Sequence, residues 1–484
     1  MKKTVFNFHN SYVNLPRIFF QHAPPEVAPY PQTCIVNNKV AAELGINLSN
    51  CETSALSAEL CGSSLDSDTQ PYCQAYAGHQ FGHYRTLGDG RAHILGEHLT
   101  PNGERWDCAV KGSGRTPYSR SGDGRAVLGP MLREYIVSEA MHALGIPTTR
   151  SLAVITTGET VSRETPLPGA ILTRLARSHL RVGTFEFAAA QQDTKLIQAL
   201  LKYAVERHFP ELLQAENTAL RFLETVIERQ SRLVTHWMRV GFIHGVMNTD
   251  NVSICGDTLD YGPCAFMDEY NPNTVFSYID SQGRYAFKNQ PIIAQWNMAR
   301  LAETLLPLIH RDSDKAIALA TNAVNQFESL YKTQWHSMMC DKLGLTTDNK
   351  KSAALIDDLL SWMQKKEADY TNTFFDLTYQ QNLKSEIYTD SKFIDWHQRW
   401  INELSISRAD NDQIGRKMRG SNPVVIPRNH QVEKVLNIAN HGNTVPLQKL
   451  LSVLESPYEH TNEKLGYQSP PQPHERIKNT FCGT

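Results

Sequence analysis

The sequence predicts an α+β fold in which a smaller β-rich half is followed by a larger helical half. From about residue 71 to residue 175, many Gly and Arg residues stand among short β-like runs. After about residue 190, apolar residues recur every three to four positions, which is the period of a helix. In such a fold we expect a functional site in the cleft between the two halves. The β-like runs are residues 92–95, 106–111, 152–155 and 170–175.

The other elements follow from local signals along the chain. The proline-rich stretch 22–31 is typical of an extended arm. A helix is predicted from Pro130, a favoured first helical residue, to near Gly145. Three more helices are predicted from the spacing of apolar residues, at 220–238, 296–309 and 315–340.

Composition excludes several classes of protein. With 484 residues, 41% hydrophobic and 20% charged, the chain is ordinary for a soluble globular protein, and wholesale disorder is not expected. A formal charge of −2 gives no reason to expect nucleic-acid binding. No run approaches about 18 apolar residues and residues 1–7 lack the apolar core of a secretory signal, so we expect a cytoplasmic protein without a membrane span. The nine cysteines contain no CxxC pair, which argues against a zinc ribbon or disulfide framework.

Lys111 is the first candidate for phosphate binding, because it ends a predicted strand. Upstream lies the turn Gly88-Asp89-Gly90-Arg91, where the backbone can approach a phosphate closely. Downstream, the predicted helix carries Glu134 and Glu139, either of which could pair with the lysine. A glycine-rich turn, a strand lysine and a helix glutamate hold nucleotide phosphates, in this order, in protein kinases.

A second motif is typical of the catalytic and metal-binding loops of kinases. The kinase pattern is H-R-D-L-x-x-x-N followed by D-F-G. In this overlay His244 takes the place of the histidine, Asn251 that of the metal-binding asparagine, and Asp260 that of the DFG aspartate. Residues 252–254, between the two loops, are predicted to form a short strand.

One position departs from the kinase pattern. The catalytic aspartate would fall at Val246, which cannot accept a proton. Two interpretations follow: the chain is a dead pseudokinase, or a neighbouring carboxylate takes over and the chemistry differs. Asp250, immediately before Asn251, is the obvious substitute.

Arginines form a third cluster in the β-rich half. Arginine forks match the geometry of phosphate oxygens, and nearby glycines let backbone amides approach them. Arg174 follows a β-like run and Arg181 lies a few residues further on, so we expect both to contact a triphosphate. Ordinary kinases do not bring this many arginines from the small lobe, which suggests a nucleotide held differently. The cluster also includes Arg115, Arg120, Arg125 and Arg177.

His79 and His83 have the i,i+4 spacing of helical zinc ligands, but Gly78 and Gly82 accompany them. Glycines disfavour the helix that such ligation needs, so we do not predict a zinc site.

Together, these motifs refine the fold prediction to a protein-kinase-like bilobal fold with a β-rich N-lobe and a larger helical C-lobe. Extensions are expected at both ends. The predicted regions are an N-terminal extension (1–69), the kinase-like N-lobe (70–190), the helical C-lobe with the catalytic and metal loops (191–440), and a C-terminal tail (441–484).

Several long stretches resemble the selenoprotein O family (YdiU in bacterial naming) of pseudokinase-fold enzymes. They span about residues 70–440. They are YAGHQFG followed by LGDGRA, AVKGSGRTPYSRSGDGRAVLGPMLREY, ILTRLARSHLRVGTFEF, GFIHGVMNTDNVSI, DYGPCAFMD, QWNMARLAETLLP and NPVVIPRNHQVE.

The resemblance implies protein adenylylation. Members of the family bind ATP in a flipped orientation and transfer AMP to Ser, Thr or Tyr hydroxyls of proteins. The β- and γ-phosphates then become the leaving group and lie deep against the small-lobe arginines. Protein substrates and ATP are the implied partners, with Mg²⁺, or Mn²⁺, as the cofactor.

The family's site residues carry over to this sequence by motif position. Asp250 matches the general base, and Asn251 and Asp260 match the ligands of Mg²⁺. Lys111 matches the phosphate-binding lysine, paired with Glu134. The remaining nucleotide contacts fall on Gly88, Gly90, Arg91, Asp123, Gly124, Arg174 and Arg181, with Asp260 again.

Some members carry selenocysteine or cysteine near the C-terminus, and here Cys482 is third from the end. In redox-regulated bacterial members this cysteine pairs with one in the activation segment. The corresponding stretch, Asn273–Ser277, contains no cysteine, so that switch is not expected here and a pairing with Cys264 is only a guess.

Three alternatives stay open from the residues. They are UMP transfer from UTP, conventional phosphoryl transfer, and a non-catalytic nucleotide-binding scaffold. The sequence indicates neither the protein substrates nor the oligomeric state.

Overall fold

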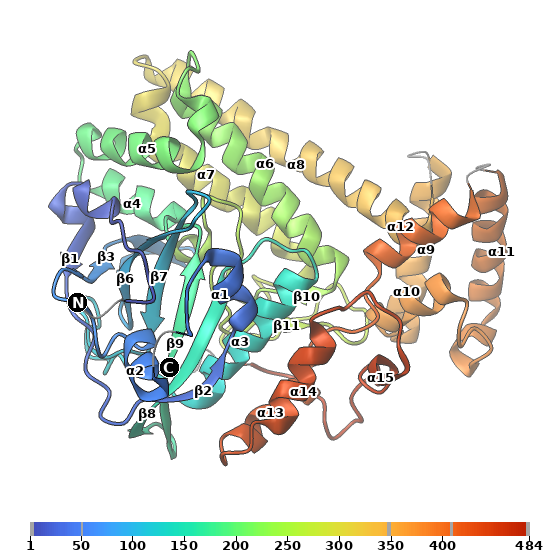
Figure 1. The fold of residues 1–484 in the computed structure, drawn as a ribbon. Coiled ribbons are helices and arrows are strands. Elements are labelled where there is room, and N and C mark those ends of the chain that lie inside the picture. Colours follow the sequence, from blue (N-terminus) through green and yellow to red (C-terminus); the bar gives the residue numbers. More distant parts are fainter. Residues whose placement is uncertain (1–3, 50–51, 346–349, 407–409, 481–484) are drawn as a thin grey trace.

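The computed structural model describes residues 4–49, 52–345, 350–406 and 410–480. A β-sheet built by the N-terminal part of the chain is followed by a long succession of helices (Figure 1). The predicted α+β fold, β-rich first and helical second, is therefore confirmed. Of the described helices, none is both long and apolar enough to cross a membrane.

A seven-stranded sheet forms the core of the N-terminal part, and all of its strand pairs are antiparallel. Its order is β1-β3-β6-β7-β9-β8-β2, so the two edge strands both come from the first 69 residues. The predicted β-like runs all lie in central strands, because these strands need apolar residues on both faces. The bounds are β1 Phe20–His22, β2 Gln32–Val36, β3 Tyr72–Gln74, β6 Ala92–Leu99, β7 Arg105–Lys111, β8 Arg150–Ser162 and β9 Pro166–Ala176.

Helix α3 (Leu128–Ala143) packs against β8 and β9. It begins two residues before Pro130, which is tolerated because amide hydrogens in a first turn have no intrahelical partner. Gly145, at φ +73°, follows its end, as the sequence predicts. The helix carries Glu134 towards the end of β7.

The helical part is organised around α6, α7 and α8, which pack against one another (Figure 1). All three were predicted, and each extends beyond the predicted range by a few residues. The bounds are α1 Asn38–Leu44, α2 Thr53–Leu60, α4 Val182–Ala190, α5 Thr194–His208, α6 Thr218–Arg239, α7 Gln290–Ile309, α8 Ser313–Leu343, α9 Lys350–Lys366, α10 Tyr370–Tyr379, α11 Ser391–Ile406, α12 Asn411–Ser421, α13 Asn429–Ala439, α14 Val445–Leu454 and α15 Asn462–Leu465.

The chain between α6 and α7 holds the predicted catalytic and metal loops. It contains the short pair β10 (Phe242–Ile243) and β11 (Ala265–Phe266) and the 3₁₀-helix η4 (Thr249–Asn251). The strand predicted at residues 252–254 is wrong, since this stretch forms only isolated bridges, from Val252 to Thr258 and from Ser253 to Arg181. Its apolar side chains are buried without a continuous strand to pair with.

The C-terminal helices return to the N-terminal part of the molecule. Both α13 and α14 contact α3 (Figure 1). At the end of the described chain, Thr480 forms a parallel bridge with Ser277, and its hydroxyl donates to Pro263 O at 2.6 Å. The final segment therefore lies along the loop that follows Asp260. Cys482 lies outside the described residues.

Candidate active site

Lys111 lies at the centre of a buried group of charged side chains. Its Nζ donates to Glu134 Oε2 and to Asp260 Oδ1, both at 2.5 Å. Since Lys111 ends β7 and Glu134 stands on α3, this pair fastens the helix to the sheet. The other glutamate of that helix, Glu139, binds Arg150 instead. Lys111 thus joins the sheet, α3 and the metal loop at one point.

Arg174, on β9, is the second cation of this group. Its Nη1 lies 3.2 Å from Glu134 Oε1 and 3.3 Å from Asp260 Oδ1. Burial by itself would raise the pKa of Asp260, but Lys111 and Arg174 outweigh it and hold that pKa well below its ordinary value. Asp260 is therefore a carboxylate at neutral pH, with two cations beside it.

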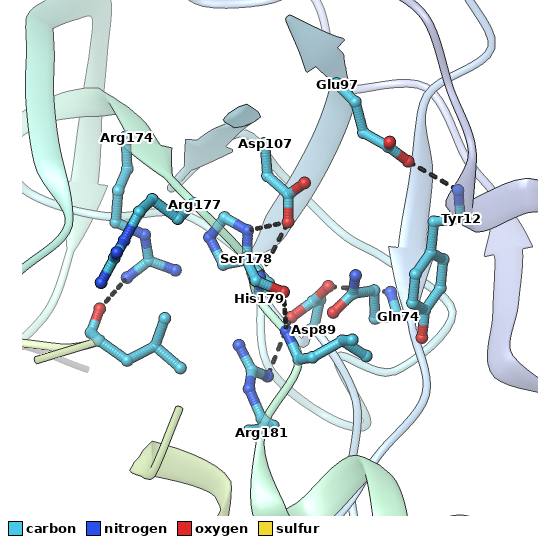
Figure 2. Close-up of polar contacts among 12 residues, drawn as sticks. Tyr12, Gln74, Asp89, Glu97, Asp107, Arg174, Arg177, Ser178, His179 and Arg181 are labelled. Carbon is cyan, nitrogen blue, oxygen red and sulfur yellow. Dashed lines mark hydrogen bonds and ion pairs between the residues drawn. The ribbon is translucent and has the colours of Figure 1, made fainter. Parts of the chain in front are cut away.

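A buried polar network fixes the chain that follows Arg174 (Figure 2). The backbone N and the Nδ1 of His179 lie 2.8 and 3.0 Å from Asp107 Oδ2. Two residues on, Arg181 Nη1 lies 3.5 Å from Asp89 Oδ1. Arg174 and Arg181 are only 6% and 4% exposed, so their positions are set by protein contacts rather than by solvent.

The turn Gly88–Arg91 leads into β6 and borders the charged group. The ring of Tyr118 covers Gly88, where a Cβ would lie 2.3 Å from the ring. The hydroxyl of Ser119 donates to Gly90 O at 2.5 Å. Arg91 lines the same pocket as Lys111 and Glu134, and it also lowers the pKa of Asp260. The turn therefore brings one more cation towards Asp260.

Asp123 and Gly124 lie in the neighbouring loop rather than within the charged group. The Asp123 carboxylate binds the Arg163 guanidinium, with an Oδ2–Nη1 distance of 2.8 Å. Gly124 has φ +68°, and a Cβ there would lie 1.9 Å from the carbonyl oxygen of Gly114. This close approach keeps the loop beside the end of β7, because Gly114 stands just after Lys111 on the chain.

Two side chains of α7 hydrogen-bond to the backbone of the predicted catalytic loop. Gln290 Oε1 accepts from the backbone N of His244 at 3.0 Å, and Asn297 Nδ2 donates to Met247 O at the same distance. The side-chain amide of Asn251 donates to Val246 O at 3.1 Å. Val246 thus contributes its carbonyl group, not a side chain, to the loop that ends in Asp250 and Asn251.

Asp250 has an environment opposite to that of Asp260. Among the described residues, its buried Oδ1 has no hydrogen-bond partner. Burial raises the pKa of Asp250 to about 6, although Arg181 partly offsets this effect. A carboxylate with an unengaged oxygen and a pKa near neutrality is suited to accept a proton.

One element of this site is not predicted by the sequence patterns: the hairpin of β4 (Ala77–Gln80) and β5 (His83–Thr86). It lies directly on the catalytic loop: the backbone N of His79 donates to Thr249 Oγ1 at 2.6 Å. His79 and His83 lie on the two strands of this hairpin, which excludes the helical geometry that zinc ligation at i,i+4 spacing would need. The available signal was the stretch from Tyr76 to Gly82, in which Gly78 and Gly82 flank a single histidine.

A family model described as "Protein adenylyltransferase SelO" matches residues 2–455. The chain belongs to this family. Its resemblance to the selenoprotein O family is thereby confirmed over nearly the whole sequence.

Curated relatives named "Protein nucleotidyltransferase YdiU" match along nearly their entire length. The relative from Nitrosococcus oceani is 52% identical over 480 residues, 99% of this chain and 97% of its own. That from Syntrophotalea carbinolica is 53% identical over 481 residues, covering 99% and 98%. That from Bacillus cytotoxicus is 50% identical over 484 residues, covering 100% and 99%. This member of the SelO family is therefore a nucleotidyltransferase.

Among solved structures, the chain is similar to ROP2 from Toxoplasma gondii, described as a virulence factor with a protein-kinase fold and no enzymatic activity. The match covers 70% of this chain and 88% of that one, with 10% identity and a TM-score of 0.24. A likeness this slight does not bear on the chemistry of the SelO-family site.

Adenylyltransferases of the SelO family use ATP and a divalent cation, and the oxygen donors of the two loops fit a cation. Asn251 donates its amide nitrogen to Val246, which leaves the side-chain oxygen for a metal. Asp260 adds a charged carboxylate. In the described part of the chain no cluster of three or more His, Cys, Asp or Glu could hold a metal alone. Nucleotide enzymes bind divalent cations through one or two side chains and the phosphates, and these two oxygen donors fit that arrangement.

Proposed function

We propose that this nucleotidyltransferase transfers AMP from ATP to Ser, Thr or Tyr hydroxyls of other proteins, with Asp250 as the general base. The observation that carries the proposal is the environment of Asp250: a half-buried carboxylate whose inner oxygen has no hydrogen-bond partner among the described residues, on the loop that lacks an acid at Val246. An acceptor hydroxyl that hydrogen-bonds to the Asp250 carboxylate would lose its proton to it as it attacks the α-phosphorus.

The cations around Asp260 support the rest of the proposal. Lys111 and Arg174 lie in one buried group, and Arg91 lines the same pocket. Cations aimed at a phosphate chain stabilise the charge that develops on the departing pyrophosphate. Arg181, which lies near enough to Asp250 to lower its pKa, would hold the terminal phosphates together with Arg174. Gly88, Gly90, Asp123 and Gly124 would line the remainder of the nucleotide.

Asn251 and Asp260 would hold Mg²⁺, which supplies charge neutralisation on the phosphates when bound. The protein's own residues do the remaining work: Lys111 and Arg174 keep Asp260 ionised, and Glu134 keeps Lys111 in place. The names of the relatives specify nucleotide transfer but not which nucleobase the nucleotide carries, so UTP is retained as a second candidate donor.

Labelled nucleotides test the proposal. The purified protein is incubated with Mg²⁺, unfolded casein as a generic hydroxyl acceptor, and ATP labelled at either the α- or the γ-phosphate. AMP transfer leaves only the α-label on protein. Label from the γ-position alone would mean ordinary phosphoryl transfer, and no label from either position would mean a nucleotide-binding scaffold. α-Labelled UTP in parallel measures the preference between donors.

A further inference from the structure

The β4–β5 hairpin is joined to the catalytic loop by a closed set of hydrogen bonds. Thr249 Oγ1 accepts from the backbone N of His79 at 2.6 Å and donates to Glu186 Oε2 at 2.5 Å. The other oxygen of Glu186, on α4, lies 2.5 Å from His79 Nδ1. We call Thr249, Glu186 and His79 the hairpin clamp. Three separate elements therefore meet at the residue that precedes Asp250.

The clamp is sheltered from water. Thr249 is fully buried, and the side chains of Glu186 and His79 are 4% and 18% exposed. Buried hydrogen bonds to a charged group are strong and leave an unsatisfied partner when one member is removed. Such a set holds a loop in one position more firmly than surface contacts do.

A second anchor lies at the turn of the hairpin. The backbone N of Phe81 donates to Asn248 Oδ1 at 3.0 Å, and the hydroxyl of Tyr285 donates to the same oxygen at 2.6 Å. Phe81 adopts φ +51°, which a residue other than glycine rarely does without surrounding support. Asn248 and Thr249, the two residues before Asp250, are thus both bonded to the hairpin.

The Asp250 side chain lies directly beneath the hairpin as a result. A Cβ at Gly78 would lie 2.1 Å from Asp250 Oδ1, so only glycine allows this approach. Gly183, at the start of α4, packs against the same hairpin and against the backbone of Asp250: a Cβ there would lie 1.9 Å from Ala77 O and 3.3 Å from Asp250 Cα. The carboxylate therefore packs against the backbone of the hairpin at Gly78, and the clamp holds that backbone in place.

We propose that the hairpin clamp of His79, Glu186 and Thr249 positions Asp250 for proton abstraction by holding the β4–β5 hairpin against the catalytic loop. The clamp residues are positioning residues and do not touch the nucleotide. The inference rests on the proposed function, in which Asp250 is the base. A displacement of about 1 Å of a reacting group can cost on the order of 100-fold in rate.

The sharpest test compares Thr249→Val with Thr249→Ser. Valine keeps the shape but removes the hydroxyl, and serine keeps the hydroxyl. With α-labelled ATP, Mg²⁺ and unfolded casein, we expect Thr249→Val to lower kcat about 10- to 100-fold. The KM for ATP should stay within about twofold, because the phosphate-binding cations are untouched. Thr249→Ser should retain at least about half of the wild-type kcat, since it can make both bonds.

Hydrogen exchange gives a readout that does not depend on activity. In Thr249→Val, the peptide that covers residues 77–86 should exchange its amides at least about tenfold faster, because the His79 amide loses its acceptor. Peptides from the β6–β7 region should be unchanged. Wild-type exchange at residues 77–86 in Thr249→Val, or equal losses in Thr249→Val and Thr249→Ser, would overturn the clamp.

Gly78→Ala tests the contact with Asp250 from the other side. The added methyl group collides with the Asp250 carboxylate, so kcat should fall about 10- to 100-fold while affinity for a fluorescent ATP analogue changes little. Gly420→Ala is the matched control, because nothing lies within 4 Å of a Cβ there. Full activity in Gly78→Ala would contradict the proposed positioning.

Asp250→Asn separates the clamp from the proposed function. If Asp250→Asn is inactive while Thr249→Val and Gly78→Ala are fully active, Asp250 is the base but the clamp does not position it. If Asp250→Asn keeps wild-type activity, the assignment of the base fails, and the clamp inference fails with it. Loss of activity in all three, with ATP affinity retained, supports both.

Discussion

Asp250 and Asp260 stand on consecutive loops between α6 and α7, yet their surroundings act on them in opposite ways. Asp260 is bonded to Lys111 and Arg174, which keep its pKa well below the ordinary value. Asp250 lies under a glycine backbone, and burial raises its pKa to about 6. Two carboxylates whose surroundings push their pKa values apart are the usual sign of a division of labour. Here the ionised Asp260 is suited to bind a metal and phosphates, and Asp250 is suited to accept a proton.

The two surroundings also differ in how they are built. The Asp260 group uses long charged side chains from β7, α3 and β9, which reach one another across the fold. The surroundings of Asp250 consist of main-chain atoms and small residues, with Gly78 against its carboxylate and Gly183 against its backbone. An ion pair between long side chains tolerates small shifts in the positions of its atoms, whereas a carboxylate packed closely against a backbone segment does not. Three predictions follow from this difference.

The largest effect is expected for Asp260→Asn. The substitution removes the only carboxylate assigned to the metal and leaves Lys111 and Arg174 facing a neutral group. We expect AMP transfer to fall at least about 1,000-fold and the affinity for Mg²⁺-ATP to fall with it. Single-turnover transfer and calorimetric titration with Mg²⁺-ATP measure the two losses. An Asp260→Asn protein that transfers AMP normally would refute the metal assignment.

The next effect is expected for Asp250→Asn. Loss of a general base costs roughly 100- to 10,000-fold in turnover, whereas the nucleotide keeps its contacts with Lys111 and Arg174. We therefore expect kcat to collapse while the Kd of a fluorescent ATP analogue stays within about threefold. Parallel loss of turnover and nucleotide affinity in this variant would mean that Asp250 serves the nucleotide and not the acceptor hydroxyl.

The smallest effect is on the free energy of unfolding, which substitutions at Asp250 and Asp260 should change in opposite directions. The rise in the pKa of Asp250 from 3.8 to about 6 means that its ionisation opposes folding by about 3 kcal/mol at neutral pH. Because the folded pKa is raised, this cost is absent near pH 4 and grows as the pH rises towards 6. In the metal-free protein, Asp250→Asn should therefore be more stable than wild type at pH 7.5 and equal to it near pH 4.

Asp260→Asn should show the reverse at neutral pH, because it breaks a buried ion pair. We expect it to lower the free energy of unfolding by about 2 to 4 kcal/mol. Urea unfolding of wild type and both variants at pH 4 and pH 7.5 measures these differences. Equal destabilisation by both substitutions would mean that the two carboxylates do not differ as described.

Much of this site follows from residue order, and the remainder does not. The strand lysine, the helix glutamate and Asp260 can be recognised from their motifs and order along the chain, and the sequence could predict that they meet. The sequence did not decide whether Glu134 or Glu139 pairs with Lys111, because both lie on the same helix. Only the packing of α3 on β8 and β9 brings Glu134 to Lys111. The short strand predicted at residues 252–254 does not form for a similar reason: no continuous strand lies beside it, and it makes only isolated bridges.

The sequence by itself determined the α+β order, the principal helices and the family, and it supplied the candidate residues for phosphate binding, metal binding and proton transfer. These depend on periodicity and on short motifs, which are properties of neighbouring residues. Only the tertiary structure decided that the edge strands of the sheet come from the first 69 residues, and that His79 and Glu186 close on Thr249. Such contacts join residues far apart in the chain, and no local pattern records which of many polar side chains will share a buried hydrogen bond.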